Sequence, residues 1–224
     1  MSNDQEDSAQ MFKKLKHYFL EREISNFYEY LNSLDEVMTI RKQEITANMN
    51  FAETKLSEKN QNDEHRKEFV NLMVEAEQIK GFTNLLRQSF LTSLYSFMEL
   101  WLIRDCHLDS QRRDGGKSYK SIKKIGLTKV VKYFSSVMKN DYPFSGKDWV
   151  WITHFQLLRD CIVHRQGSLT GFSDFEINPT LAKFIDSEPS LSLFGIDNKQ
   201  VFIEYDFCVK AMKTVERVML ELII

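Results

Sequence analysis

The stretch that decides the fold is residues 147–167, KDWVWITHFQLLRDCIVHRQG. A glycine just past the last helical residue is a common helix stop, so we expect one helix that ends at Gly167. Asp160 and His164 are one helical turn apart and lie on the polar side of this helix. The opposite side carries apolar residues at helical spacing, which predict a core-facing stripe: Trp151, Phe155, Leu158 and Ile162.

The polar side of this helix is not uniformly polar. Gln156 and Arg159 lie toward it, but apolar residues flank them. A helix that is apolar nearly all round is normally buried. We therefore expect a second packing surface, either another helix or a second copy of the chain. The flanking apolar residues are Trp149, Leu157, Cys161 and Val163.

Composition indicates one helical core, or a core with an appendage. The chain has 224 residues, of which 42% are hydrophobic, and its eight Gly and three Pro are few, which favours helix. A net charge of −2 means that nucleic-acid binding must depend on a local basic patch.

Neither a metal site nor a cofactor is expected. Three widely spaced cysteines and five scattered histidines match no disulfide framework or zinc pattern. The acidic N-terminus does not resemble a secretory signal, and no apolar run reaches the roughly 20 residues of a membrane span. We therefore expect a cytoplasmic protein without a membrane partner.

The first helical region has a regular apolar row but two possible structures. Residues 10–56 contain neither Gly nor Pro and predict one or two long helices, with Ser33 or Asp35 as a possible break and cap. The row either packs on the rest of the bundle or forms a coiled-coil arm that pairs with a partner or a second copy. We therefore treat residues 1–60 as an extension and 61–224 as the main domain. The row is Phe27, Leu31, Leu34, Met38, Ile45, Met49, Ala52 and Leu56.

The remaining chain predicts an antiparallel helical bundle of the mostly-α class. Helices are expected over about 66–104, 118–139 (with Ser118 as N-cap) and 206–222, with a loop over 105–116. A short turn is expected near 181–185. Alternating residues on both sides of Asp197 predict a small β-hairpin before the last helix.

The order Arg159-Asp160-Cys-Ile-Val-His164, late in a long helix, resembles the signature of the HEPN superfamily. The resemblance covers about residues 66–224 and implies an all-α bundle that acts as a homodimer. It also implies metal-independent RNA cleavage at a composite site, where the signature helices of two copies face each other. The expected partners are RNA and an antitoxin or regulatory protein, in toxin–antitoxin or antiviral defence systems.

The residue types suit that chemistry. His164 serves as general acid or base, and Arg159 can fork onto two phosphate oxygens. Asp160, one turn before His164, is placed to orient the imidazole. Glu99 has two possible positions, at the edge of its own helix stripe or turned inward to meet Arg159 or His164. Gln156 and Arg165 are supporting candidates, the latter as a phosphate contact or a helix C-terminal cation.

A basic stretch provides the candidate RNA contacts. Between Arg112 and Lys132, eight basic residues stand against one Asp, a local charge of +7. The stretch is either a solvated lysine face or a positively charged surface that binds the phosphate backbone of RNA. The candidate contacts are Lys117, Lys120, Lys123 and Lys124.

At one position the sequence differs from the pattern of a particular branch of HEPN proteins. HEPN toxins paired with nucleotidyltransferase antitoxins usually carry a Tyr two residues after the signature His, where this chain has Gln166. That branch is therefore disfavoured, while branches tied to phage defence do not need the Tyr. The alternative function is a non-catalytic scaffold or protein-interaction module, in which Arg159, Asp160 and His164 join helices through ion pairs.

Overall fold

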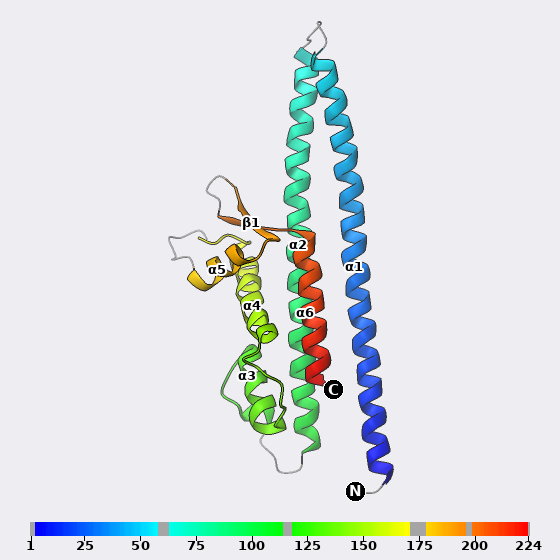
Figure 1. Ribbon diagram of the computed structural model, residues 1–224, viewed down its shortest axis with the longest axis vertical. Helices are drawn as coiled ribbons and strands as arrows, with labels where there is room; N and C mark the ends of the chain where they lie inside the picture. Colours follow the sequence, from blue (N-terminus) through cyan, green and yellow to red (C-terminus); the bar gives the residue numbers. More distant parts are fainter. Residues whose placement is uncertain (1–2, 58–62, 114–117, 171–177, 196–198, 224) are drawn as a thin grey trace.

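Two long antiparallel helices, α1 (Asn3–Ser57) and α2 (Asp63–Arg112), run the length of the molecule (Figure 1). The computed structural model describes residues 3–57, 63–113, 118–170, 178–195 and 199–223. The break expected at Ser33 or Asp35 is wrong, because α1 continues through both. Asp35 does not cap a helix; its Oδ1 accepts a hydrogen bond from Arg87 Nη2 of α2 at 3.1 Å.

The apolar row of α1 packs on α2 within the same chain. Four residues of the row, and Ile24 before it, are buried at a spacing of seven, which is the spacing of a two-helix seam. Of the two alternatives for this row, packing on the bundle is the one observed. The division near residue 60 stays a prediction, and residues 58–62 lie outside the described residues. The buried positions are Ile24, Leu31, Met38, Ile45 and Ala52.

Although α1 and α2 have the length of membrane helices, charged residues interrupt them throughout. Among the described residues, no helix combines the length and apolar character that crossing a bilayer requires.

The region after α2 differs from expectation in two places. The loop expected from Asp105 is wrong, because α2 continues to Arg112 and Asp105 is buried in an ion pair with Lys16 of α1. The single helix expected over 118–139 is divided into a 3-10 turn η1 (Tyr119–Ser121), α3 (Gly126–Tyr133) and a π-helical turn η2 (Phe134–Met138). Ser118 is an N-cap as expected, but of η1, where its side chain accepts from Lys120 N.

The C-terminal elements agree with expectation. A short helix α5 (Pro179–Ser187) precedes an antiparallel hairpin of β1 (Leu191–Phe194) and β2 (Gln200–Ile203), in which Leu191 pairs with Ile203. The turn at Asp197 lies outside the described residues. The last helix is α6 (Tyr205–Ile223), so the described residues form six α-helices and one small hairpin.

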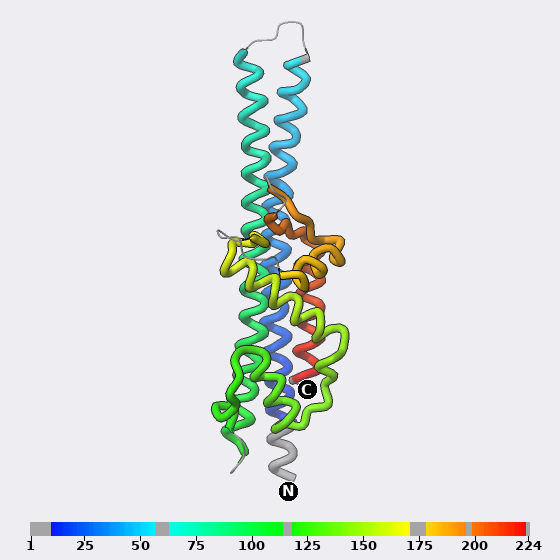
Figure 2. The backbone as a smooth tube through the Cα atoms, turned by 90° about the vertical axis from the view of Figure 1, so that its left-hand side faces the viewer, coloured from blue at the N-terminus to red at the C-terminus, as the bar shows by residue number. Residues whose placement is uncertain are grey.

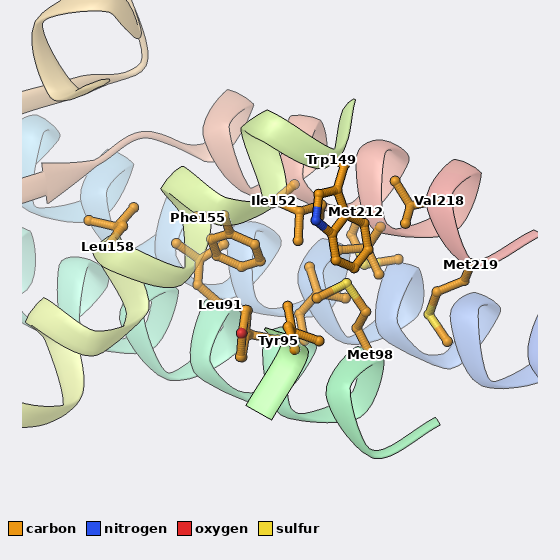
Figure 3. Packing of buried hydrophobic residues seen from close by; sticks show 14 of the residues in the cluster. Leu91, Tyr95, Met98, Trp149, Ile152, Phe155, Leu158, Met212, Val218 and Met219 are labelled. Carbon is orange, nitrogen blue, oxygen red and sulfur yellow. The ribbon is translucent and has the colours of Figure 1, made fainter. Parts of the chain in front are cut away.

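The core lies where α4 (Lys147–Arg165) meets α2 and α6 (Figure 3). Phe155 is fully buried, and its ring centroid lies 5.7 Å from that of Tyr95 in an edge arrangement. Burial of one such side chain contributes about 1.5–3 kcal/mol. The side chains that α4 directs at this core are Trp149, Ile152, Phe155 and Leu158, facing Leu91, Tyr95 and Met98 of α2 and Met212, Val218 and Met219 of α6.

The hairpin fastens the C-terminal end of α4 to the middle of α2, as the tube in Figure 2 shows. Buried Asn84 of α2 donates to Val201 O at 3.0 Å and accepts from Ile203 N at 2.9 Å. Val201 N in turn donates to Gly167 O at 2.9 Å. The C-terminal end of α4 is therefore joined to β2 by a backbone hydrogen bond and β2 to α2 through Asn84, and above this point α1 and α2 continue as a two-helix arm (Figure 2).

Candidate active site

The ends of α4 are fixed by different means. At the N-terminal end, Asp148 accepts two hydrogen bonds from Arg217 of α6, at 2.5 and 3.0 Å. At the C-terminal end, Gln166 and Gly167 are both left-handed, with φ of 53° and 76°. A Cβ on Gly167 would lie 2.7 Å from Nε2 of buried Gln88, so the position needs glycine for its conformation and for its space.

Arg159 is the centre of an ion cluster between α4 and α2. Its Nη1 donates to Asp160 Oδ1 at 2.7 Å, and its Nη2 donates to Glu99 Oε2 at 3.4 Å. The side chains of Arg159 and Glu99 are 20% and 22% exposed, so the cluster lies at the surface edge of the core. Of the two positions expected for Glu99, the structure shows the inward one, toward Arg159. The three groups together carry a formal charge of −1.

The guanidinium also lies on an aromatic ring. Arg159 Cζ is 4.5 Å from the ring centroid of Tyr95, one turn before Glu99 on α2. Burial, and secondarily the charge of Glu99, raises the pKa of Tyr95, which keeps the phenol neutral. Among the described residues, neither the Tyr95 hydroxyl nor Arg159 Nε has a hydrogen-bond partner, although both are buried.

His164 stands apart from that cluster. It is exposed in the last turn of α4, about 7.5 Å along the axis from Arg159. No hydrogen bond within the described residues joins it to Asp160, whose carboxylate receives Arg159 instead. The structure thus brings Arg159, Asp160 and Glu99 together and leaves the imidazole facing solvent.

The other two supporting candidates are Gln156 and Arg165. Gln156 is half-buried on α4. Arg165 Nη1 donates to the carbonyl oxygen of Leu169 at 3.2 Å, which stabilises the turn after the helix. For Arg165, both expected roles, a phosphate contact and a helix C-terminal cation, stay predictions.

The basic stretch lies next to Glu99. Gly126, the first residue of α3, is so close that a Cβ there would lie 3.2 Å from Glu99 Oε1. Lys120, Lys123 and Lys124 precede α3 and are exposed, while Lys117 lies outside the described residues. The fold therefore brings the start of α3, which directly follows these lysines in the chain, next to the Glu99 side of the ion cluster.

The apolar residues that flank the polar side of α4 differ in burial. Trp149 and Cys161 belong to the core of the same chain, and Leu157 is half-buried against it. Val163 is exposed beside His164. Another helix thus covers part of the flank, as one of the two alternatives expected.

Sequence reasoning missed Tyr95 and Gly126. Tyr95 precedes Glu99 by four residues, so helical spacing would have placed both on one face of α2. No local signal marks Gly126, because its contact with Glu99 joins residues that are far apart in the chain.

The chain matches no protein-family model, no curated protein and no solved structure in the comparisons made. The resemblance to HEPN proteins therefore remains an expectation that rests on the order Arg159-Asp160…His164 and on the helical architecture.

Proposed function

We propose that the protein is a metal-independent endoribonuclease of HEPN type, with a composite site formed by the α4 helices of two copies. The observation that carries the proposal is the pairing, on one helix, of a fixed guanidinium with an exposed imidazole. Arg159 is held by Glu99, Asp160 and the Tyr95 ring, while His164 faces solvent near the end of the helix.

The reaction is internal transesterification of RNA. His164 of one copy takes the proton of a ribose 2′-hydroxyl, whose oxygen attacks the adjacent phosphorus. The bond from phosphorus to the 5′-oxygen breaks, and His164 of the second copy gives that oxygen a proton. The products are a 2′,3′-cyclic phosphate and a free 5′-hydroxyl. Arg159 stabilises the charge that develops on the phosphorane oxygens.

The composite arrangement follows from the number of histidines. Each α4 offers one exposed imidazole at its C-terminal end, whereas the reaction needs a base and an acid. A two-fold axis beside α4 supplies both from identical residues. Exposed Val163 and half-buried Leu157 are the apolar residues that such a contact would cover. Lys120, Lys123 and Lys124 would contact the RNA backbone on the Glu99 side.

A second function, a non-catalytic interaction module, is favoured by one specific observation. Both terminal nitrogens of Arg159 already donate to carboxylates, so the ion cluster can join α4 to α2 without any ligand. A phosphate would have to displace one carboxylate. In this alternative, loss of Arg159 lowers stability and loss of His164 has no effect on RNA.

The test is cleavage of a mixed RNA pool in EDTA, with wild type, His164→Ala and Arg159→Ala at equal concentration. We expect the wild type to leave 2′,3′-cyclic phosphate ends and both variants to lose cleavage by at least a hundredfold, in line with general acid–base catalysis. The matched control is His65→Ala, because His65 lies at the start of α2, far along the chain from α4.

Circular dichroism and thermal unfolding of each variant accompany the assay. A folded wild type that cuts no RNA at any protein concentration or salt, or a His164→Ala variant that cuts as fast as wild type, contradicts the nuclease proposal. In the first case the interaction module becomes the favoured function.

A further inference from the structure

Outside the row that packs on α2, α1 carries further apolar residues, two of which, Leu15 and Phe19, border a pocket whose other wall is α2. Eight large apolar side chains of this helix are between 41% and 63% exposed, although a helix in contact with water on one side normally keeps that side polar. They are not the row that packs on α2. The exposed residues are Met11, Leu15, Tyr18, Phe19, Tyr30, Val37, Ile40 and Phe51.

Most of them belong to one regular series, which we call the outer row. Its steps of three and four residues average about 3.6, so the row runs straight along one face of the helix. From Met11 inward the steps are four, three and four, and from Phe51 inward they are again four, three and four. Both ends are mostly apolar and the middle is polar. The outer row is Met11, Leu15, Tyr18, Arg22, Asn26, Glu29, Ser33, Val37, Ile40, Glu44, Ala47 and Phe51.

We propose that the outer row is a self-association surface, along which two copies pair antiparallel through α1. The three outermost steps at each end are the same, so the two ends of the row meet in register when one copy is turned end to end, as a two-fold interface requires. Met11 of one copy then lies opposite Phe51 of the second copy, and Leu15 lies opposite Ala47. The axis passes between positions 29 and 33.

The charges of the outer row favour the antiparallel direction. Antiparallel pairing places Arg22 opposite Ile40 of the second copy, with Glu36 and Glu44 of that copy one turn to either side. A parallel, in-register pair would place Arg22 against Arg22 and Glu29 against Glu29. Like charges directly across a helical seam are destabilising, so the second copy is accepted in one direction only.

The size of the surface is adequate for a stable dimer. Positions 11 to 51 span about 60 Å of helix, and a helix is about 10–12 Å wide. Two copies would therefore bury roughly 1,300 Å² in total, within the range of specific interfaces. Tyr28 and Asn32 bond Glu216 and Tyr205 of α6, so α6 lies on a different side of α1 from the outer row.

This surface is separate from the candidate active site. Figure 1 shows α1 and α4 on opposite sides of α2. A contact through the outer row leaves α4 free, and a contact through α4 leaves the outer row free. If both form, the assembly is larger than a dimer.

The first experiment measures assembly by sedimentation equilibrium of the full chain. We expect Phe51→Glu to raise the dissociation constant of the α1 contact at least tenfold, because Phe51 is 62% exposed and the charge would enter an apolar end of the row. The matched control is Val70→Glu, which adds the same charge at an exposed apolar residue of α2 and should leave assembly unchanged. Both variants should keep the wild-type rate in the RNA assay.

The second experiment determines direction by disulfide trapping. The described cysteines, Cys106, Cys161 and Cys208, are all buried, so introduced thiols dominate the reaction. A Leu15→Cys copy mixed with an Ala47→Cys copy should form a covalent dimer at least ten times faster than either copy alone. Faster linkage of each copy to itself would overturn the antiparallel pairing. A wild type that is monomeric, or whose mass is unaffected by Phe51→Glu, would overturn the outer row as an interface whatever the outcome of the RNA assay.

Discussion

The two halves of α2 have different surroundings, although they belong to one uninterrupted helix. In the body, Phe90, Leu94 and Met98 are fully buried, because α1, α4 and α6 cover several faces of the helix. In the arm, which comprises residues 36–57 and 63–83, the covered face is the seam with α1, and at the base of the arm Lys80 also lies over the Phe202 ring of β2. There Leu72 and Ile79 of α2 remain half-exposed. The number of neighbouring elements, rather than the apolar content of the helix, decides how deeply a residue is buried.

One face of α2 makes the contrast explicit. In the body this face carries Gln88 and Tyr95, both buried beneath α4 and the turn after it. In the arm the same face carries Val70 and Val74, which are exposed. The body therefore gains stability from long-range packing, whereas the arm depends on a single helical seam.

The largest loss of stability is expected from a substitution in the core of the body. Phe155→Ala removes a fully buried ring between α2 and α4 and should lower the free energy of unfolding by about 3–5 kcal/mol. Urea denaturation followed by circular dichroism measures it. Thr153→Ala, on the exposed side of the same helix, is the control and should change stability by less than about 0.5 kcal/mol. A loss below about 1 kcal/mol for Phe155→Ala would contradict the packing described.

A smaller effect is expected in the arm. Ile45→Ala removes a buried residue of the α1–α2 seam, and about 2 kcal/mol is expected because its neighbours are already partly exposed. Hydrogen exchange should show faster exchange of amides in residues 36–57 and 63–83, with those of α4 and α6 unchanged. Equal acceleration in both regions would mean that the arm and the body open as one unit.

Two glycine substitutions should change the free energy of unfolding in opposite directions. Gly167→Ala places a Cβ 2.7 Å from Gln88 Nε2 at a positive φ and should destabilise by about 1–2 kcal/mol. Gly81→Ala, in the helical interior of the arm, meets no atom within 4 Å and should stabilise by about 0.5–1 kcal/mol. Thermal unfolding of both variants checks the difference, and a shift of the same sign in both would contradict it.

The smallest effect concerns pH and the N-terminal end of α4. The hydrogen bonds from Arg217 hold the pKa of Asp148 below its ordinary value, so the pair stabilises the fold at neutral pH. This contribution is present above the unfolded pKa of about 4 and is lost as the pH falls toward the lower folded pKa. Asp148→Asn should cost about 0.2–1 kcal/mol at pH 7. The difference from wild type should shrink below about pH 4 in thermal unfolding, and a constant difference down to pH 2 would refute this assignment.

Local signals in the sequence were sufficient for α4 and the hairpin. Gly167 marked the helix end because a left-handed residue beside Gln88 requires glycine, and alternation around the turn marked β1 and β2. The end of α2 was not predictable in this way. Asp105 looks like a loop residue until its partner Lys16, 89 residues earlier, is known.

The position of Glu99 shows the same limit for the candidate site. Its neighbours on α2 are apolar, so local sequence allowed an edge or an inward position. Its hydrogen bond to Arg159 joins residues 60 positions apart and depends on the packing of α4 on α2. Likewise, the one-turn spacing of Asp160 and His164 suggested a bond between them, but Arg159 is the group that Asp160 binds.

By itself, the sequence determined the helical class, the length and end of α4, the hairpin and the regular apolar row of α1. These depend on helical and strand periodicity and on glycine conformation, which act over a few residues. The tertiary structure alone decided which partner each polar group takes, that the first apolar row of α1 is covered by α2, and that the outer row is left open. Such outcomes depend on which elements meet, and residues far apart in the chain decide that together.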